Sequence, residues 1–328
     1  MSTLLDVRNL SVVLPTSKGP LHAVQRVSFS VERGETLCIV GESGCGKSMT
    51  ALAIMDLLPP GAKRSADALI FDGDELSQRS GAIAGLRGRR ISMIFQEPMT
   101  SLNPVFTIGD QLTTVFRKNG KGSRAQAKER ALYLLERVGI THAPQRLGQY
   151  PHELSGGLRQ RVMIAMALMC GPDLIVADEP TTALDVTVQA ELLHLLMELQ
   201  KEFGMGLVLI THDLGIVSRI ADRICVMYAG QVVESGTPAQ IFGSSRHPYT
   251  TGLMCCLPSN ARSGEAHLAT IRGTVPSLVG ELRGCRFRER CDLARPACDD
   301  DIALLEHPGG HLARCIVTAE ETSLASRA

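Results

Sequence analysis

The chain has 328 residues, 44% of them hydrophobic, so it can bury one large core, or one core with a smaller appended unit. Lys plus Arg and Asp plus Glu both number 34, and this zero net charge argues against a general nucleic-acid binder. Tryptophan is absent and aromatic residues make up 4% of the chain, which disfavours stacking surfaces for single-stranded nucleic acid. The composition is still compatible with a local pocket for one compact anion.

The sequence predicts neither a signal peptide nor a membrane span. Asp6 and Arg8 stand where a signal peptide needs its apolar core. The longest apolar run, Val162–Cys170, is far shorter than the roughly 20 residues that span a bilayer. We therefore expect any membrane role to depend on partner chains.

From residue 3 to about 237, short β-branched runs alternate with helical stretches, which is typical of an α/β domain. The buried strands predicted from apolar runs are Glu35–Val40, Leu174–Ala177, Leu207–Ile210 and Arg223–Tyr228. Apolar residues at helical spacing predict a helix at Ala125–Val138. Ala229-Gly230 before Gln231–Glu234 predicts a hairpin, and with it an antiparallel section beside the parallel core.

A glycine-rich segment follows the first of these strands and fits the pattern G-x-x-x-x-G-K-[ST]. Its residues are Gly41, Glu42, Ser43, Gly44, Cys45, Gly46, Lys47 and Ser48, and we assign nucleotide binding to them and to Met49. The strand Thr36–Val40 precedes it, and a helix predicted at Met49–Leu58 follows. Glycines let backbone N–H groups surround a phosphate, and a helix N-terminus adds partial positive charge. We expect Lys47 to span the β- and γ-phosphates and Ser48 to bind Mg²⁺. The alternative is a glycine-rich turn with an exposed lysine.

Two adjacent carboxylates, Asp178 and Glu179, end the apolar strand that begins at Leu174. Neighbouring side chains of a strand face opposite ways, so the two acids cannot share a role. Asp178 suits the shell of Mg²⁺, and Glu179 can act as general base on a water in line with the γ-phosphate. Taken alone, the pair could also be a solvated acidic turn.

Leu154-Ser155-Gly156-Gly157-Leu158-Arg159-Gln160 is the most specific segment, and we call it the signature segment. Ser155 is expected to cap a helix that runs through Cys170, and Gly156 and Gly157 leave its first amides bare. Such an anion site has no lysine of its own, so it needs a phosphate held elsewhere. With the preceding motifs, the segment resembles the LSGGQ signature of the ABC (ATP-binding cassette) ATPases, with Leu158 in place of the final Gln. The alternative is an ordinary capped helix.

The resemblance covers residues 3–240 and implies a P-loop NTPase cassette. This fold has a RecA-like core, an antiparallel β section and a helical signature part at about residues 97–170. It implies a head-to-tail pair in which each signature segment closes over the ATP of the other subunit. Gln96 resembles the glutamine that touches Mg²⁺ and the attacking water, Asp185 the acid that acts across the dimer, and His212 the histidine that contacts the γ-phosphate.

One family feature is missing. These ATPases stack adenine on an aromatic residue upstream of the glycine-rich segment, and residues 14–26 contain no Tyr, Phe or Trp. His22 is the nearest residue that could stack, and the contact is left unassigned.

Residues 241–328 form a C-terminal region that is richer in Pro, Gly, Arg and Cys, with a weakly ordered tail expected at Ala319–Ala328. His247-Pro-Tyr-Thr250, Gly41-Glu-Ser-Gly and Phe95-Gln-Glu-Pro-Met-Thr-Ser-Leu-Asn-Pro104 resemble the oligopeptide/dipeptide importer subfamily. Importers of nickel and other small solutes share these stretches.

Four cysteines of this region have the spacing C-x5-C-x6-C-x16-C: Cys285, Cys291, Cys298 and Cys315. The spacing resembles a motif that some of these importer ATPases use to hold a [4Fe–4S] cluster. Four thiolates suit such a cluster, and Zn²⁺ accepts four as well. The spacing lacks close C-x2-C pairs, which favours iron–sulfur over zinc, and four reduced thiols are the alternative.

The resemblance implies an ATPase that uses ATP and Mg²⁺ to energise a peptide importer, at the cytoplasmic face of the inner membrane. Its implied partners are a second ATPase subunit, identical or homologous, two membrane permeases and a periplasmic solute-binding protein. The rival hypotheses are a nickel or other small-solute importer, an exporter motor, and a soluble ABC ATPase acting on DNA or ribosomes. No nucleic-acid partner is expected.

Overall fold

The computed structural model describes residues 2–77, 81–97, 101–120, 122–182, 184–257, 270–280 and 282–317. The tail expected at 319–328 and part of the importer-like stretch, residues 98–100, lie outside the described residues. The chain divides into two compact units. The first contains Met1–Leu4, Val31–Glu35 and Arg79–Ile210, and the second contains Leu5–Ser30, Thr36–Gln78 and Thr211–Ala328. Within the described part of the chain, no helix is both long and apolar enough to span a bilayer.

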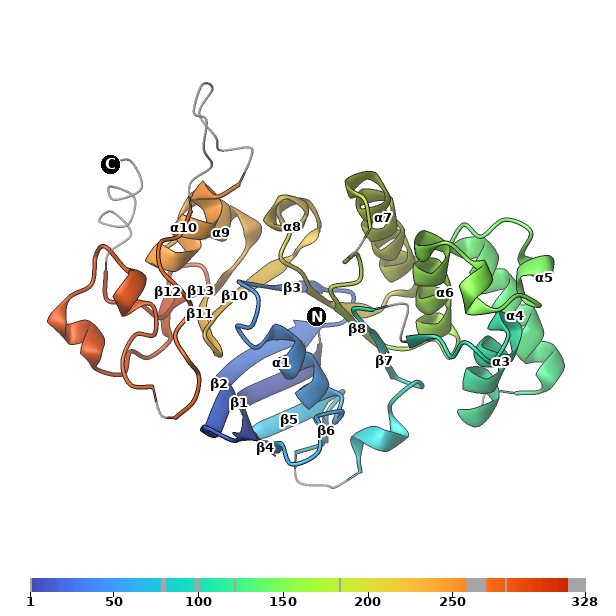
Figure 1. Ribbon diagram of the computed structural model, residues 1–328, viewed down its shortest axis with the longest axis horizontal. Helices are drawn as coiled ribbons and strands as arrows, with labels where there is room; N and C mark the ends of the chain where they lie inside the picture. Colours follow the sequence, from blue (N-terminus) through green and yellow to red (C-terminus); the bar gives the residue numbers. More distant parts are fainter. Residues whose placement is uncertain are drawn as a thin grey trace. The chain divides into compact units, whose positions relative to one another are not determined.

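Three parallel strands form the sheet of the first unit (Figure 1). They are β7 (Ile91–Ile94), β8 (Leu174–Asp178) and β9 (Gly206–Ile210), and β8 pairs with both others. Every residue of β8 and β9 is buried, as expected of parallel strands covered on both faces. The predicted strands 174–177 and 207–210 are confirmed.

The helices of this unit are α3 (Ile108–Lys118), α4 (Arg124–Arg137), α5 (Ala143–Arg146), α6 (Gly156–Leu168) and α7 (Val186–Phe203). Helix α4 packs between α3 and α6 and buries Ala127, Ala131, Leu134 and Leu135. The helix predicted at 125–138 is therefore confirmed. The signature helix ends at Leu168, two residues before the predicted end, and Gly171 follows with φ +63°.

An antiparallel sheet accounts for most of residues 3–75. Its strands are β1 (Thr3–Thr16), β2 (Gly19–Glu32), β4 (Lys63–Ser65), β5 (Ala68–Phe71) and β6 (Asp74–Glu75), in the order β2-β1-β5-β6 with β4 on β1. Leu5 faces Phe71 and Val7 faces Leu69, so alternate residues of β1 enter the core.

The second unit also contains the strands β3 (Thr36–Val40), β10 (Arg223–Tyr228), β11 (Gln231–Gly236), β12 (Leu305–His307) and β13 (His311–Ala313). Strand β10 runs parallel to β3 and antiparallel to β11, and β13 pairs with β11 and β12. The turn between β10 and β11 has Ala229 at φ +46° and Gly230 at φ +84°, as in a tight hairpin. The predicted strands 35–40 and 223–228 and the hairpin are confirmed.

The helices of the second unit are α1 (Lys47–Ile54), α8 (Leu214–Ile220), α9 (Pro238–Gly243) and α10 (Pro248–Cys255). The sequence predicted α1 at 49–58 and was wrong at both ends. Asp56 takes φ +53° after the C-cap Met55, so the chain leaves the helix before the two prolines that were expected to stop it.

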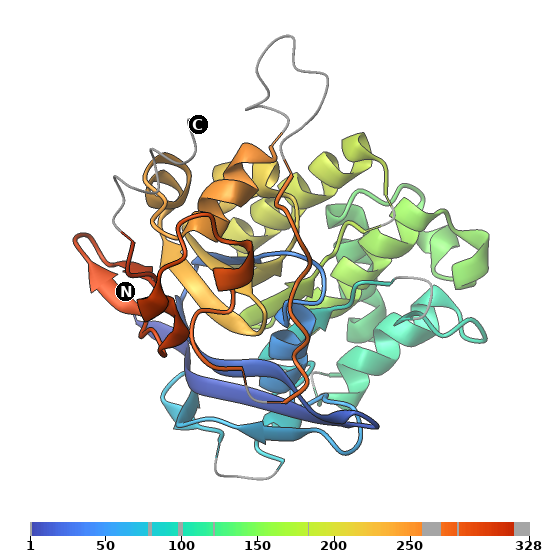
Figure 2. The same ribbon diagram turned by 60° about the vertical axis from the view of Figure 1, so that its left-hand side comes forward.

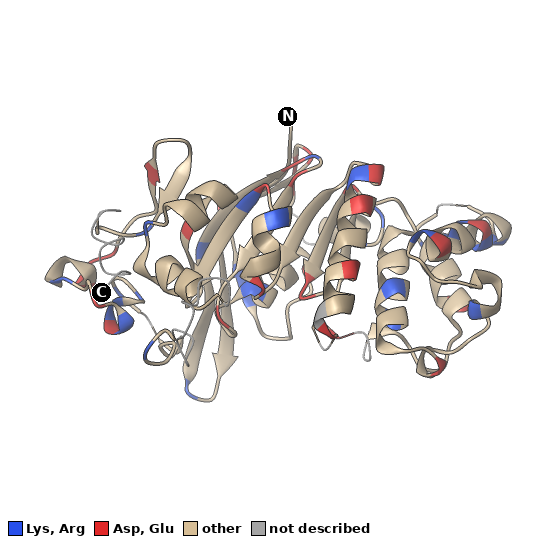
Figure 3. Ribbon diagram, turned by 90° about the horizontal axis from the view of Figure 1, so that it is seen from above, with Lys and Arg blue, Asp and Glu red and all other residues tan. Residues whose placement is uncertain are grey.

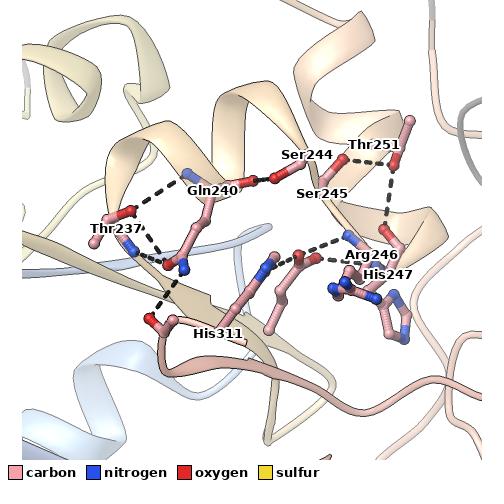
Figure 4. A network of polar contacts seen from close by, with 10 residues as sticks. Thr237, Gln240, Ser244, Ser245, Arg246, His247, Thr251 and His311 are labelled. Carbon is pink, nitrogen blue, oxygen red and sulfur yellow. Dashed lines mark hydrogen bonds and ion pairs between the residues drawn. The ribbon is translucent and has the colours of Figure 1, made fainter. Parts of the chain in front are cut away.

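Glu234, a fully buried carboxylate on β11, links the segments that carry Arg246, His247 and His311, which Figure 4 labels. It accepts hydrogen bonds from the backbone N–H groups of Arg246 at 2.7 Å and His247 at 2.9 Å, and it pairs with His311 Nε2 at 2.7 Å. Burial lowers the pKa of His247 to about 4, so its neutral Nδ1 accepts the N–H of Tyr249 at 3.1 Å. The loop before α10 and strand β13 therefore share one buried anchor.

Residues 270–280 form an extended segment whose end meets the start of β2 (Figure 2). The N–H of His22 donates to Leu278 O at 2.8 Å, and the N–H of Gly280 donates to Pro20 O at 2.9 Å. The C-terminal region is thus part of the same compact unit as the glycine-rich segment. The domain boundary after residue 240 stays a prediction.

Candidate functional site

The glycine-rich segment, residues 41–48, connects β3 to α1 in the second unit, and we call it the phosphate loop. Gly41 has φ +151°, and a Cβ there would lie 2.1 Å from Met227 O. Gly46 has φ +104°, and a Cβ there would lie 2.4 Å from Ala23 O. Both contacts are with backbone atoms, which cannot give way. This loop can therefore form only with glycine at both positions.

Lys47 lies inside the phosphate loop, with 4% of its surface exposed. Its Nζ donates to Gly41 O at 2.8 Å and to Glu42 O at 3.1 Å. A buried ammonium with neutral partners is a strong attractor for an anion, because little water competes for it. Ser48 and Met49 are half-buried in the first turn of α1, and Ser43 and Gly44 are exposed. Burial raises the pKa of the fully buried Cys45 thiol, which is thus held neutral.

His212 also belongs to the second unit, and it is exposed. The N–H of its neighbour Thr211 donates to Ile39 O at 3.2 Å, which places this stretch beside the end of β3. Asp213 then caps α8 by accepting the N–H of Gly215 at 2.9 Å. His212 therefore follows a residue that is bonded to β3 near the end where the phosphate loop begins.

In the first unit, Asp178 and Glu179 stand at the end of β8. Asp178 is 5% exposed and Glu179 is half-buried, as expected for neighbours on opposite faces. Glu179 has φ +43°, a conformation that non-glycine residues rarely adopt. Its N–H donates to Ile210 O at 2.9 Å, so the neighbouring strand β9 holds this backbone in place. Such backbone strain is concentrated at functional sites.

The Glu179 carboxylate is oriented by two side chains. Gln96 Nε2 donates to Glu179 Oε2 at 3.3 Å, and Thr182 Oγ1 donates to the same oxygen at 3.0 Å. The structure therefore brings Gln96 and Glu179 together. The sequence analysis missed Thr182, although a hydroxyl three residues after the carboxylate was a signal for it.

The signature segment begins α6 in the first unit. Ser155 is the N-cap, and its Oγ accepts the N–H of Leu158 at 3.4 Å. Ser155 and Gly156 are exposed. A Cβ on Gly156 would come no closer than 3.9 Å to Leu184, and one on Gly157 no closer than 3.5 Å to Val188. These are ordinary contacts, so the fold of this chain does not require glycine at either position.

Gln160, in the signature segment, and Asp185 also have partners within the chain. Gln160 is 1% exposed and donates through Nε2 to Pro180 O, which links α6 to the segment after Glu179. Asp185 is exposed and caps α7, where its carboxylate accepts the N–H of Val188 at 3.0 Å. Asp185 therefore has a structural role whatever it contacts in a second subunit.

The four cysteines of the C-terminal region are all free thiols in the second unit. The Cys285 N–H donates to Cys298 O at 2.8 Å, and burial raises the pKa of Cys285, of Cys291 and, to about 11, of Cys315. The charges of the other three thiols add to the rise in the pKa of Cys315. Among the described residues, however, no group of three or more His, Cys, Asp or Glu could hold a metal ion as the side chains stand.

Charged residues of both signs are spread over many elements (Figure 3).

Comparison with known proteins agrees with these motifs. The ABC transporter family profile matches residues 24–182, and the profile of the oligopeptide/dipeptide transporter C-terminal region matches residues 233–298. The chain is 47% identical over 325 residues to the oligopeptide transport ATP-binding protein AppD of Bacillus subtilis, covering 98% of each. It is also 47% identical over 325 residues to the oligopeptide transport ATP-binding protein OppD of Haemophilus influenzae, covering 99% of this chain and 100% of that protein.

Solved structures give the same fold. The dimeric ATP-binding cassette MJ0796, bound to ADP and phosphate, has a TM-score of 0.64 and 26% identity, covering 72% of this chain and 99% of that chain. CbiO1 from Clostridium perfringens, part of an ABC transporter complex, has a TM-score of 0.62 and 29% identity, covering 74% of this chain and 91% of that one. The chain described here is an ABC ATPase, and it belongs to the family of ATP-binding subunits of oligopeptide and dipeptide transporters.

Proposed function

We propose that this ABC ATPase binds Mg-ATP on its phosphate loop and hydrolyses it with Glu179 to power the import of peptides. The observation that carries the proposal is the phosphate loop itself, which the fold allows only with glycine at 41 and 46 and which encloses Lys47. The names of the relatives, oligopeptide and dipeptide transport proteins, support peptides as the solute.

Each predicted residue has a role in this scheme. Lys47 and the loop amides bind the β- and γ-phosphates. Ser48 of the second unit, and Asp178 and Gln96 of the first, are each assigned to Mg²⁺, which neutralises phosphate charge when bound. Glu179, fixed by Gln96 and Thr182, takes the proton of the attacking water. His212 is assigned to the γ-phosphate.

The bare amides of the signature segment support a second ATPase subunit. Gly156 and Gly157 are not needed by the local fold, yet a side chain there would cover the first amides of α6. Glycine at these two positions is explained if a phosphate held by another subunit approaches those amides. Each subunit of a pair would then complete the site of the other, and Asp185 would lie at the same contact.

Replacing Lys47 with alanine tests the phosphate loop. We expect Lys47→Ala to weaken Mg-ATP binding by about a hundredfold, because the charge-assisted bonds of this lysine to two phosphates are lost. Titration calorimetry on the purified chain measures this. Lys18→Ala, at an exposed position on the turn between β1 and β2, is the control and should bind as the wild type does. Unchanged affinity in Lys47→Ala would show that the loop does not bind the triphosphate.

The membrane partners follow from the family. We assign two permeases, a solute-binding protein outside the membrane, and a position at the cytoplasmic face of the inner membrane. The names of the relatives, which are transport ATP-binding proteins, support this assignment.

The proposal includes a [4Fe–4S] cluster or zinc on the four C-terminal cysteines. Thiolates are suitable donors, but the side chains as they stand do not fit a metal site, so we assign the cluster no step in ATP hydrolysis. Analysis of anaerobically purified protein tests this, and about four iron and four sulfide per chain would establish the cluster. Zinc alone would change the assignment to zinc, and the absence of iron, sulfide and zinc would leave four thiols.

A further inference from the structure

Residues 285–291, between the first two cysteines of the C-terminal motif, pack against the base of the phosphate loop. The centre of the Phe287 ring lies 5.3 Å from the centre of the Tyr228 ring and 5.4 Å from the centre of the Tyr249 ring. Arg286 donates through Nη1 to Ala229 O in the β10–β11 turn. The next residue of that turn, Gly230, donates its N–H to Cys45 O in the loop at 2.8 Å.

Arg290 reaches the phosphate loop directly. Its Nη1 donates to Glu42 Oε2 at 2.8 Å, and its Nη2 donates to Glu42 Oε1 at 3.1 Å. This bidentate ion pair joins residues that lie 248 positions apart in the sequence. The Arg290 side chain is 6% exposed and that of Glu42 is 25% exposed, so the pair is shielded from water far more than a surface salt bridge.

Glu42 is also held through both of its backbone polar groups. Its N–H donates to Tyr249 Oη at 2.9 Å, and its carbonyl accepts Lys47 Nζ at 3.1 Å. One residue of the loop is therefore connected to Arg290, Tyr249 and the phosphate-binding lysine. A shift of Glu42 would move a carbonyl that positions Lys47.

Arg290 is also held by groups other than Glu42. It donates to Arg272 O at 2.8 Å and to Ile271 O at 3.2 Å, and its guanidinium lies 5.7 Å from the centre of the Tyr228 ring. The carbonyls come from the extended segment 270–280, which is itself bonded to β2. The arginine is therefore a rigid support for the glutamate.

The negative charge of Glu42 would disfavour ATP binding if Arg290 did not neutralise it. A carboxylate in a loop that receives a triphosphate repels it, and the repulsion grows where water is excluded. A neighbouring guanidinium cancels that charge, and the two parallel bonds direct the carboxylate toward Arg290. The glutamate can then contribute its backbone to the loop without its charge opposing the substrate.

We propose that Arg290 of the cysteine motif is a positioning residue for ATP, which neutralises and fixes Glu42 so that the phosphate loop accepts a triphosphate. The inference rests on the proposed role of the loop. It gives the C-terminal region a part in nucleotide binding through a single ion pair, whether or not its cysteines hold a metal.

A double-mutant cycle on the full-length chain tests this, with the affinity for Mg-ATP measured by titration calorimetry. We expect Arg290→Gln to weaken binding about tenfold, because it leaves an unpaired carboxylate in the loop. Glu42→Gln alone should change affinity by less than about threefold, since a hydrogen-bonding partner remains for Arg290. Glu42→Gln combined with Arg290→Gln should recover to within about threefold of the wild type, because no unpaired charge remains. A purely structural role for Arg290 would show no such recovery.

Arg288→Gln is the matched control. Arg288 lies in the same short helical turn, Arg288–Arg290, but pairs with the exposed Asp299 at 3.3 Å, so its loss should leave ATP affinity unchanged. Thermal melting of every variant reports on folding. Arg290→Lys, which keeps the charge but not the two parallel bonds, serves if Arg290→Gln melts far below the wild type. It should bind ATP within about threefold of the wild type, because the charge of Glu42 is still cancelled.

Wild-type affinity in Arg290→Gln, or a double variant as weak as Arg290→Gln, would overturn the inference. So would an Arg290→Lys variant that folds normally and binds about tenfold more weakly. Failure of the loop assignment is distinguishable, because then Lys47→Ala would bind ATP as well as the wild type.

Discussion

Glu179→Gln is expected to bind Mg-ATP with wild-type affinity and to lower turnover by about a hundredfold to ten-thousandfold, the usual contribution of a general base. The amide keeps the shape of the side chain and can still accept a hydrogen bond from Thr182, so the site stays assembled. It cannot take the proton of the attacking water. Phosphate release from the assembled transporter, with calorimetry on the isolated chain, measures both quantities.

Glu198→Gln is the control for this experiment. Glu198 is an exposed carboxylate on α7 of the same unit, where it lies 3.3 Å from His194. Its loss should leave binding and turnover unchanged. Turnover that is undiminished in Glu179→Gln would show that another group is the base.

Gly156→Asp is expected to lower turnover of the assembled transporter by about a hundredfold or more, because it places a carboxylate where a triphosphate of the other subunit would lie. The isolated chain should fold and bind ATP as the wild type does. A Cβ at this position meets nothing closer than 3.9 Å, and an acidic residue in the first turn of α6 suits the helix dipole. Turnover, melting temperature and affinity separate these effects.

Gly85→Asp is the matched control for the signature variant. Gly85 is an exposed glycine of the same unit, and a Cβ there would meet nothing within 4 Å. Its substitution should leave turnover unchanged. If Gly156→Asp also kept full turnover, the amides of α6 would not face a nucleotide.

Much of the architecture follows from local patterns. Strand β8 is a continuous apolar run, so its burial and its parallel pairing were predictable from residues 174–177. The phosphate loop was predictable because glycines at fixed spacing between a strand and a helix are a local signal. The ends of α1 were not, because the exit from that helix depends on Asp56 adopting a left-handed conformation.

The support of the site was less predictable, because it depends on distant contacts. Nothing near Glu42 in the sequence indicates Arg290, and the two meet only because the segment 270–280 and the hairpin after β10 bring the cysteine motif to the loop. Thr182 was missed for a different reason. Its hydroxyl follows Glu179 closely, but its orientation depends on the unusual backbone conformation of that residue.

Light scattering on Glu179→Gln, mixed with the second ATPase subunit of its transporter, tests the central claim most directly. That claim is that one subunit holds a triphosphate on its phosphate loop while the signature amides of another close over it. Mg-ATP should convert separate subunits into a pair of about twice the mass. The pair should not form when the Glu179→Gln chain also carries Gly156→Asp. Subunits that stay separate at saturating Mg-ATP, or a pair indifferent to Gly156→Asp, would contradict it.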